Sequence, residues 1–572
     1  MQIPLHQTWQ EKAVAKVAKT RAKIPQEWIL SKADIDDARQ QRQLSGPFIE
    51  RFLDSEEREI IRHDSVPLLS KIRSGHYTAL QVAKAYCKTE AIAHQANNCL
   101  HEIIFHQAMQ RAMELDDYLK KNKTTMGPLH GLPISLKDQF HVKGVDTTMG
   151  YIGWIDTYEG DTDPNKVHKV ESQIVTELLS LGAVIYCKTS VPQSLLLGET
   201  VNNLIGRTLN PVNQLLSCGG SSGGEGALNS LRGSSLGVGT DIGGSVRIPA
   251  AFCGIYSVKP THNRFSYRDA GNTNPGQTTY ASSIGFLSNS IDGLELVMSS
   301  VLSTQPWLRD PEVVTMPWRQ DLVDSTLSRA SPEGSSNGNS PLKLGIYWTD
   351  GVVGPQPPII RGLHTVVDTL RKAGHKVVDW NPPSQSTAKR VHLAFLKADG
   401  AHDIQKQLNI SGEPLIPELV KSFQLRNPMN LLEYQDLTLQ GRDYSEAYSD
   451  YWNSTANDED GQIVDAVIMP VAPHAAVIPG KYYHTAYTEA INLMDYSAAV
   501  IPVTRANKTL DTFNSEYKPL NDVDRKNWEA YDADVYDGAP VGVQLVARKY
   551  EEEKVWAIAK IVSTALKTAR PL

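Results

Sequence analysis

One local unit constrains the fold of this 572-residue chain more than any other: an amphipathic helix followed at once by a buried strand. Residues 170–190, VESQIVTELLSLGAVIYCKTS, place apolar side chains at helical spacing up to Gly182, which ends the helix, and continue as a short apolar run. The same order returns at residues 358–380, and residues 538–567 give a strand and then a long amphipathic helix. Repeated units of this kind predict an α/β fold, with a mixed, largely parallel β-sheet covered by helices on both faces.

The first part of the chain has a different texture. Residues 1–125 are mostly polar, with apolar side chains at helical spacing and no strand-like alternation. We therefore predict a helical N-terminal extension over residues 1–70 and one large α/β domain over residues 71–572. Residues 325–341, STLSRASPEGSSNGNSP, are of low complexity and are predicted to form a mobile surface insertion.

The bulk composition excludes several functional classes. The 57 basic and 64 acidic residues leave a formal net charge of −7, without the basic concentration that favours nucleic-acid binding. No apolar run approaches the length of a membrane span, and the N-terminus lacks the apolar segment of a secretory signal. The five cysteines are scattered, with no CxxC pair and no zinc-ligand spacing, which is typical of reduced thiols. These features predict a cytoplasmic protein without a membrane span or a bound metal.

Residues 217–254, SCGGSSGGEGALNSLRGSSLGVGTDIGGSVRIPAAFCG, are rich in glycine and serine, yet they do not have the texture of a flexible linker. Apolar side chains interrupt the stretch, and it ends in a segment of buried composition. Glycine at this density beside ordered structure indicates backbone that closely approaches another group. The DIGGS segment at 241–245 would offer adjacent backbone N–H groups, as an oxyanion hole or an anion nest requires.

Two arrangements could activate a serine in this stretch. In the first, GGSSG at 219–223 forms a GxSxG nucleophile elbow that works with a later histidine, His474 or His484, although the preceding residues make a poor strand. In the second, a neutral lysine activates the serine hydroxyl and no histidine is needed. Lys137 suits that task, because it ends the apolar run GLPISLK and burial would lower its pKa. An ordinary solvated lysine at a strand end is the plainer alternative.

Three segments taken together resemble the amidase signature family: GLPISLKD (131–138), GGSSGGEGAL (219–228) and GTDIGGSVRIPAAFCG (239–254). Further similar segments extend the resemblance over most of residues 70–570, so that residues 71–572 would be an amidase signature catalytic domain. In length and character the chain is most similar to fungal acetamidase-like general amidases. The resemblance implies hydrolysis of a carboxylic amide to an acid and an amine or ammonia through an acyl-enzyme, with no metal or organic cofactor.

The resemblance also assigns roles to single residues. Ser245 matches the nucleophile, Ser221 matches the bridging serine that follows a cis peptide bond, and Lys137 matches the general base. The oxyanion hole would be formed by the backbone N–H groups of four consecutive residues: Ile242, Gly243, Gly244 and Ser245.

Polar neighbours of these residues have expected roles of their own. Asp241 and Arg247 flank the nucleophile and are expected to pair across the tight loop, which would hold its amides in place. Ser222 and Thr240 are expected either to hydrogen-bond the serine–lysine relay or to satisfy turn backbone.

The substrate pocket is predicted from positions that match the family near the site. They are mainly apolar, which favours an aliphatic or aromatic acyl group over a charged one, and each could equally be core. The predicted pocket residues are Met149, Gly150, Tyr151, Leu195 to Leu197 and Thr240. Residues 492–496, NLMDY, either line the pocket or pack against the sheet. The expected partner is a small-molecule amide, and a homodimer stands as the alternative to a monomer.

Other functions on the same fold stay open at this point. The amidase subunit of a tRNA-dependent amidotransferase shares the catalytic segments, but it would need a partner subunit. A fatty-acid-amide hydrolase would favour an exposed apolar segment for membrane docking, and the sequence has no clear one. A non-catalytic binding protein is a third alternative, because a fold does not fix a function. Lys137, Ser221 and Ser245 argue against it, since a retired site has no chemical reason to keep a desolvated lysine.

Overall fold

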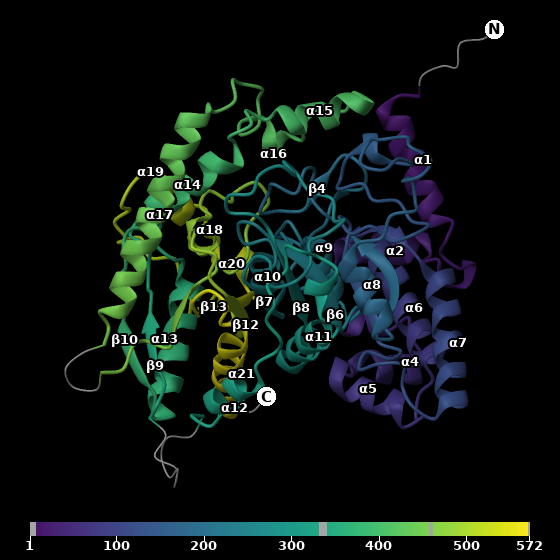
Figure 1. The fold of residues 1–572 in the computed structure, drawn as a ribbon, viewed down its shortest axis with the longest axis horizontal. Coiled ribbons are helices and arrows are strands. Elements are labelled where there is room, and N and C mark those ends of the chain that lie inside the picture. The colour runs from purple at the N-terminus through teal and green to yellow at the C-terminus, as the bar shows by residue number, and fades with distance from the viewer. Residues whose placement is uncertain (1–6, 331–339, 457–460, 570–572) are drawn as a thin grey trace.

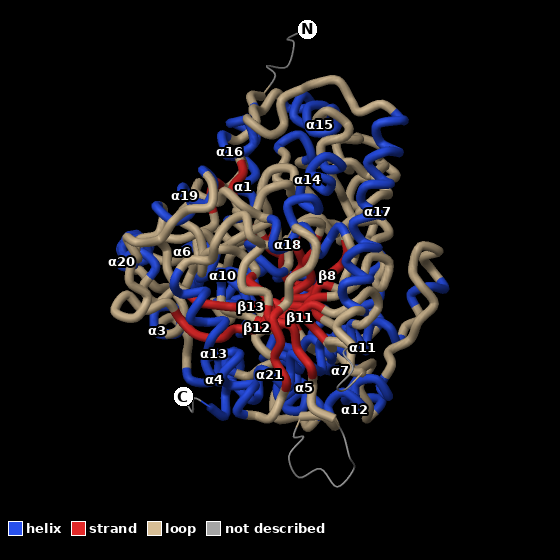
Figure 2. Tube along the Cα trace, turned by 90° about the vertical axis from the view of Figure 1, so that its left-hand side faces the viewer, coloured by secondary structure: helices blue, strands red, loops and turns tan. Residues whose placement is uncertain are grey.

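An eleven-stranded sheet forms the centre of the molecule, and helices surround it (Figures 1 and 2). The computed structural model describes residues 7–330, 340–456 and 461–569. The strand order is β1-β3-β2-β6-β8-β7-β12-β13-β11-β9-β10, and β4 and β5 form a separate two-stranded sheet. The strands are β1 (Leu100–Ile103), β2 (Pro133–Lys137), β3 (Val184–Thr189), β4 (Val201–Asn202), β5 (Gly206–Arg207), β6 (Leu236–Asp241), β7 (Tyr256–Lys259), β8 (Ser283–Ser288), β9 (Lys343–Ile346), β10 (Lys376–Asp379), β11 (Ala466–Pro470), β12 (Ala498–Arg505) and β13 (Pro540–Val546).

The expected mixed sheet covered by helices is confirmed. Its parallel pairs lie in two groups of three strands rather than throughout: β3-β2-β6 and β11-β9-β10. The pairings between and beside these groups are antiparallel. Parallel neighbours β2 and β6 end at the same edge of the sheet, so the side chains that follow them meet there.

Helices follow the amphipathic segments of the sequence. Several begin with a capping box, in which the N-cap side chain and the side chain three residues later satisfy two amides reciprocally, as at Thr78 with Gln81. The helices are α1 (Trp9–Arg21), α2 (Lys32–Gln40), α3 (Pro47–Glu50), α4 (Ser55–Arg62), α5 (Ser65–Arg73), α6 (Ala79–Asn97), α7 (Phe105–Asn122), α8 (Gln173–Ser180), α9 (Gly223–Ser230), α10 (Arg247–Cys253), α11 (Ile291–Ser303), α12 (Gln320–Leu327), α13 (Pro357–Lys372), α14 (Gln385–Leu396), α15 (His402–Ser411), α16 (Pro417–Val420), α17 (Leu431–Asn453), α18 (Ala486–Leu493), α19 (Asp522–Glu529), α20 (Ala533–Tyr536) and α21 (Glu552–Ala569). Short 3-10 turns lie at η1 (Gln26–Trp28), η2 (Ile152–Trp154) and η3 (Pro306–Leu308).

The N-terminal part is helical, as predicted, and its helices gather on one side of the sheet (Figure 1). Their apolar side chains, among them Ile24, Trp28 and Leu68, belong to the same hydrophobic core as Leu566 near the C-terminus. The strand β1 is an addition that the sequence did not predict, because four residues are too short to show an alternation. The division into domains at residue 70 stays a prediction.

The predicted surface insertion at 325–341 falls largely outside the described residues, since these omit 331–339. Its first residues belong to α12. Among the described residues, no helix combines the length and the apolar composition needed to cross a membrane.

Candidate active site

Lys137 is the last residue of β2, a strand that is buried along its whole length. Its Nζ donates to Ser221 Oγ at 2.8 Å and to Thr240 Oγ1 at 2.8 Å. The Thr240 hydroxyl in turn donates to Gln139 Oε1 at 2.6 Å. The lysine of GLPISLK is therefore an interior residue at the edge where β2 and β6 end, and not the solvated strand end of the plainer alternative.

The protonation of Lys137 is set by its surroundings. Burial lowers the pKa of Lys137 to about 7, against the opposing fields of the Asp241 and Glu225 carboxylates. A large fraction of the amine is therefore neutral near pH 7, which gives the nitrogen a lone pair able to accept a proton. A solvated lysine would keep its proton at that pH.

Ser221 and Ser245 lie in two loops that meet in front of Lys137. The Gly220–Ser221 peptide bond is cis. The loops are joined by a hydrogen bond from the Ser222 amide to the Ser245 carbonyl oxygen at 3.1 Å. Both serines line one small chamber of about 20 Å³, together with Thr240 and Ile242. The tertiary structure thus brings together three groups that the sequence separates: Lys137 contacts Ser221, and Ser221 and Ser245 line the same chamber.

One of the glycines that follow Ser221 allows the chain to pass close to the backbone of another segment. A Cβ on Gly224, in the first turn of α9, would lie 2.3 Å from the backbone nitrogen of Ser190. The Ser190 backbone cannot move far enough to relieve such a clash, so a residue without a Cβ is required where α9 begins.

The expected pair of Asp241 and Arg247 is present and fully buried. Arg247 Nε donates to Asp241 Oδ2 at 3.1 Å, and Arg247 Nη2 donates to Asp241 Oδ1 at 3.0 Å. The guanidinium also donates to Gln544, Asn492 and the Thr488 carbonyl oxygen. Burial alone would raise the pKa of Asp241, but the charge and hydrogen bonds of Arg247, with the Lys259 charge and the Asn492 hydrogen bond, together outweigh it and hold that pKa well below its usual range.

This ion pair shapes the loop that carries Ser245. The Gly244 amide donates to Asp241 Oδ1 at 2.8 Å, so one of the four predicted oxyanion donors is already occupied. Within the described part of the chain, the amides of Ile242, Gly243 and Ser245 donate to no protein acceptor. Free N–H groups beside a serine hydroxyl, here on both sides of the occupied Gly244 amide, are what stabilisation of an oxyanion requires.

The remaining predicted polar residues separate into two roles. Thr240 touches the lysine, whereas Ser222 Oγ reaches only the backbone of Thr240, at 3.4 Å from its carbonyl oxygen. Asn492, from the NLMDY segment, donates to Asp241 Oδ1 at 2.9 Å and so supports the loop.

The nucleophile-elbow alternative would place a histidine beside Ser221. His484 instead bonds Asp350, and the His474 ring packs against the rings of Phe252 and Tyr482. The Ser221 hydroxyl contacts Lys137. The geometry therefore favours the lysine arrangement over the histidine one.

A cavity of about 290 Å³ opens beside Ser245. Leu195 and Leu197 line it, as the sequence suggested, together with Leu196. Sequence reasoning missed most of the remaining lining residues, which lie 148 to 244 residues beyond Ser245 in the chain and carry no local motif: Leu393, Leu396, Lys397, Glu418, Ser422, Phe423, Gly480, Tyr482, Thr485 and Glu489.

Met149, Gly150 and Tyr151 require a correction. They were expected in the pocket, but they line neither of the two cavities beside Ser245. Met149 and Tyr151 are fully buried in an apolar cluster with Trp154, which also contains Leu195 and Phe423 of the cavity lining.

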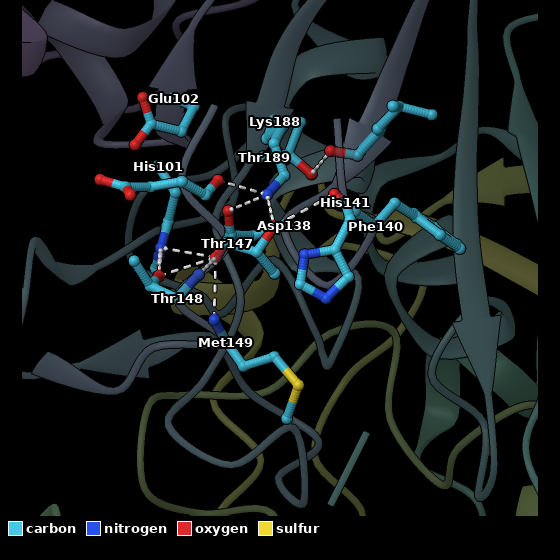
Figure 3. A network of polar contacts seen from close by, with 12 residues as sticks. His101, Glu102, Asp138, Phe140, His141, Thr147, Thr148, Met149, Lys188 and Thr189 are labelled. Atoms are coloured by element: carbon cyan, nitrogen blue, oxygen red, sulfur yellow. Dashed lines mark hydrogen bonds and ion pairs between the residues drawn. The ribbon is translucent and has the colours of Figure 1, made fainter. Parts of the chain in front are cut away.

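Figure 3 shows a network of polar contacts around Asp138 that includes this segment. Asp138, the residue after Lys137, accepts from the Thr148 hydroxyl at 2.7 Å and from the Met149 amide at 2.9 Å. Its other oxygen forms an ion pair with Lys188 at 3.1 Å, and His101 Nδ1 bonds the Thr148 hydroxyl at 2.8 Å. The network fixes the backbone that leads from β2 into the apolar cluster. Because Asp138 follows Lys137 directly, these residues also help to fix the end of β2.

One group of potential metal ligands among the described residues, Asp146, Asp156 and His168, has its donor atoms close together. Asp146 already accepts from Lys16 at 2.7 Å and bonds the His168 ring at 2.5 Å. These contacts account for the cluster without a cation, and we assign no metal to it.

Comparison with known proteins agrees with this geometry. The family model described as Amidase matches residues 81–556. The chain is 41% identical over 565 residues to an acetamidase of Emericella nidulans, with 98% of each chain covered. It is 39% identical over 561 residues to an acetamidase of Aspergillus oryzae, covering 98% of this chain and 99% of that one. A solved fatty acid amide hydrolase superposes with a TM-score of 0.86 at 30% identity, over 98% of this chain and 97% of the other. With a buried lysine, two facing serine loops and matches that span nearly its whole length, the chain belongs to the amidase family.

Proposed function

We propose that the protein hydrolyses a small carboxylic amide through an acyl-enzyme, with Ser245 as nucleophile, Ser221 as bridging serine and Lys137 as general base. One observation carries the proposal: a fully buried lysine, with its pKa lowered to about 7, donates to Ser221 at 2.8 Å in the chamber that Ser245 shares. Burying the charged form of a lysine costs free energy, and strongly shifted pKa values of this kind cluster at functional sites.

In the first half of the reaction, neutral Lys137 accepts the proton of Ser221, which accepts the proton of Ser245. Ser245 Oγ forms a bond to the carbonyl carbon of the amide, and the carbonyl oxygen becomes an oxyanion. The amides of Ile242, Gly243 and Ser245 stabilise it, and each lost donor of this kind costs about 2.7–4 kcal/mol of transition-state stabilisation.

The carbon–nitrogen bond then breaks. An unprotonated amine is a very poor leaving group, so Lys137 returns its proton through Ser221 to the departing nitrogen. Water next gives its proton to the same relay and attacks the acyl-enzyme, which releases the acid and restores the Ser245 hydroxyl. The base and the acid are one group, and a pKa near neutrality lets it serve both steps.

The acyl group that fits is small. The cavity beside Ser245 holds about 290 Å³, and the curated relatives with the highest identity reported above are named acetamidases. A cavity of this size suits a compact amide better than a long chain.

The test is covalent labelling with a fluorophosphonate, read by intact mass and peptide mapping. We expect a single adduct on Ser245 in the wild type, none in Ser245→Ala, and labelling slowed about 100-fold or more in Lys137→Ala. Ser222→Ala is the matched control, because that hydroxyl reaches only backbone, and it should label at close to the wild-type rate. An adduct on Ser221, or undiminished labelling of Ser245→Ala, would show that the roles are wrong.

A further inference from the structure

Helix α18 (Ala486–Leu493) lies directly over the loop that carries Ser245, beside α14. Thr488 Oγ1 donates to the Gly243 carbonyl oxygen at 2.7 Å. The next residue, Glu489, also faces the loop: its Cγ would be 3.6 Å from a Cβ placed on Gly243. Glu489 lines the cavity of about 290 Å³ together with Ser245, so its carboxyl group is close to the reacting carbonyl.

The carboxyl group of Glu489 is only half satisfied. The residue is 6% exposed. Its Oε1 accepts from the Thr485 hydroxyl at 2.7 Å, but its Oε2 is buried and has no hydrogen-bond partner among the described residues. A buried carboxylate oxygen without a donor is costly, and such atoms in a binding cavity indicate a ligand that supplies the donor.

The other charged side chains that line the cavity make no direct ion pair with Glu489 among the described residues. Glu199 and Glu418 line the same cavity, but both bond Arg207. Lys397 also lines it, yet its ammonium lies over the Phe423 ring, 5.7 Å from the centroid. Burial lowers the pKa of Lys397 and the Glu489 charge partly opposes it, so the two charges interact, although the described residues include no ion pair between them. The cavity therefore presents one carboxylate oxygen, Glu489 Oε2, that no described cation contacts directly, beside the loop that carries Ser245.

We propose that Glu489 binds a cationic amino group of the substrate, and that the preferred substrates are short amides that carry a primary ammonium on the acyl chain. This proposal rests on the proposed amide hydrolysis and departs from the apolar acyl group expected from the sequence. Because the Glu489 side chain lies against Gly243, the ammonium and the scissile carbonyl are separated by a short chain. The leucines at 195–197, which line the same cavity, would contact the methylenes between the ammonium and the carbonyl.

The experiment compares pairs of amides of equal length, in which an ammonium replaces a methyl group: glycinamide with propionamide, β-alaninamide with butyramide, and 4-aminobutyramide with valeramide. In the wild type, at least one ammonium amide should have a kcat/KM about 10- to 100-fold above that of its methyl partner, the value of one charge-assisted hydrogen bond. In Glu489→Gln, which keeps the shape of the side chain, the ratio of kcat/KM between each ammonium amide and its methyl partner should fall to about one, through a higher KM for the ammonium amide.

The matched control is Glu418→Gln, which removes a carboxylate of the same cavity that is already paired with Arg207. It should keep the preference for ammonium amides, and loss of the preference in this variant alone would overturn the assignment to Glu489. A wild type that cleaves methyl amides as well as ammonium amides would overturn the proposal without any variant. An enzyme that cleaves no amide of either series, and takes no fluorophosphonate adduct, would instead contradict the proposed function.

Discussion

The buried Arg247 guanidinium offers the sharpest test of how the loop that carries Ser245 is held in place. Arg247 makes five side-chain hydrogen bonds: two to Asp241 and one each to Gln544, Asn492 and the Thr488 carbonyl oxygen. Lysine keeps the positive charge but has three donors on a single nitrogen and cannot form the paired contact with Asp241. The substitution Arg247→Lys therefore removes at least two charged hydrogen bonds from a site without water access.

The magnitude follows from those contacts. Each hydrogen bond to a charged group contributes about 1.5–3 kcal/mol, so the loss of two lowers the free energy of unfolding by about 3–6 kcal/mol. That is a large fraction of the total stability of about 5–15 kcal/mol typical of proteins. Without the paired contact to Arg247, the Asp241 carboxylate is free to move and no longer fixes the Gly244 amide. The free amides of the same loop then lose their fixed positions. We expect fluorophosphonate labelling of Ser245 to slow by about 100- to 1,000-fold, the effect of losing one oxyanion donor.

The assay measures urea unfolding and the labelling rate on the same samples. Arg264→Lys is the matched control: Arg264 is equally buried and pairs with Glu552 and Glu553, but it lines neither cavity beside Ser245. It should lose a comparable free energy of unfolding and, in the folded sample, label at close to the wild-type rate. If Arg247→Lys labelled as fast as Arg264→Lys, the ion pair would be a stabilising contact with no role in holding the loop.

Two further predictions concern the pH dependence set by Lys137 and the steric requirement at Gly244. Because burial lowers the pKa of Lys137 to about 7 and the neutral amine is the active form, kcat/KM should fall about tenfold per pH unit below that value and level off above it. An acidic limb near 10.5, the ordinary lysine value, would contradict the burial argument. Gly244 has a φ of +121°, and a Cβ there would lie 2.5 Å from Thr488 Oγ1, so Gly244→Ala should reduce turnover about 100-fold or more. Gly276→Ala, where a Cβ meets no atom within 4 Å, should retain the wild-type rate, and equal losses in the two variants would refute the steric reasoning.

Much of the candidate site could be predicted from the sequence because its residues lie in short, contiguous segments. The run GLPISLK predicts a buried strand that ends on a lysine, and β2 ends at Lys137 as expected. The spacing of Asp241 and Arg247 across a glycine-rich turn predicts their ion pair, since only five residues of tight loop separate them. Helix and strand periodicity likewise predicted the α/β sheet, because each period is a property of consecutive residues.

The tertiary structure decided what depends on residues far apart in the chain. Only the packed loop shows that Asp241 takes the Gly244 amide and leaves three donors instead of four. Met149 and Tyr151 follow β2 in sequence, yet they are buried in an apolar cluster and line neither cavity beside Ser245, and Asp138 accepts a hydrogen bond from the Met149 amide. Glu489, in the cavity lining, joins the site from 244 residues beyond Ser245 (489 − 245). Local periodicity carries no information about such contacts, since they depend on how the helices pack over the completed sheet.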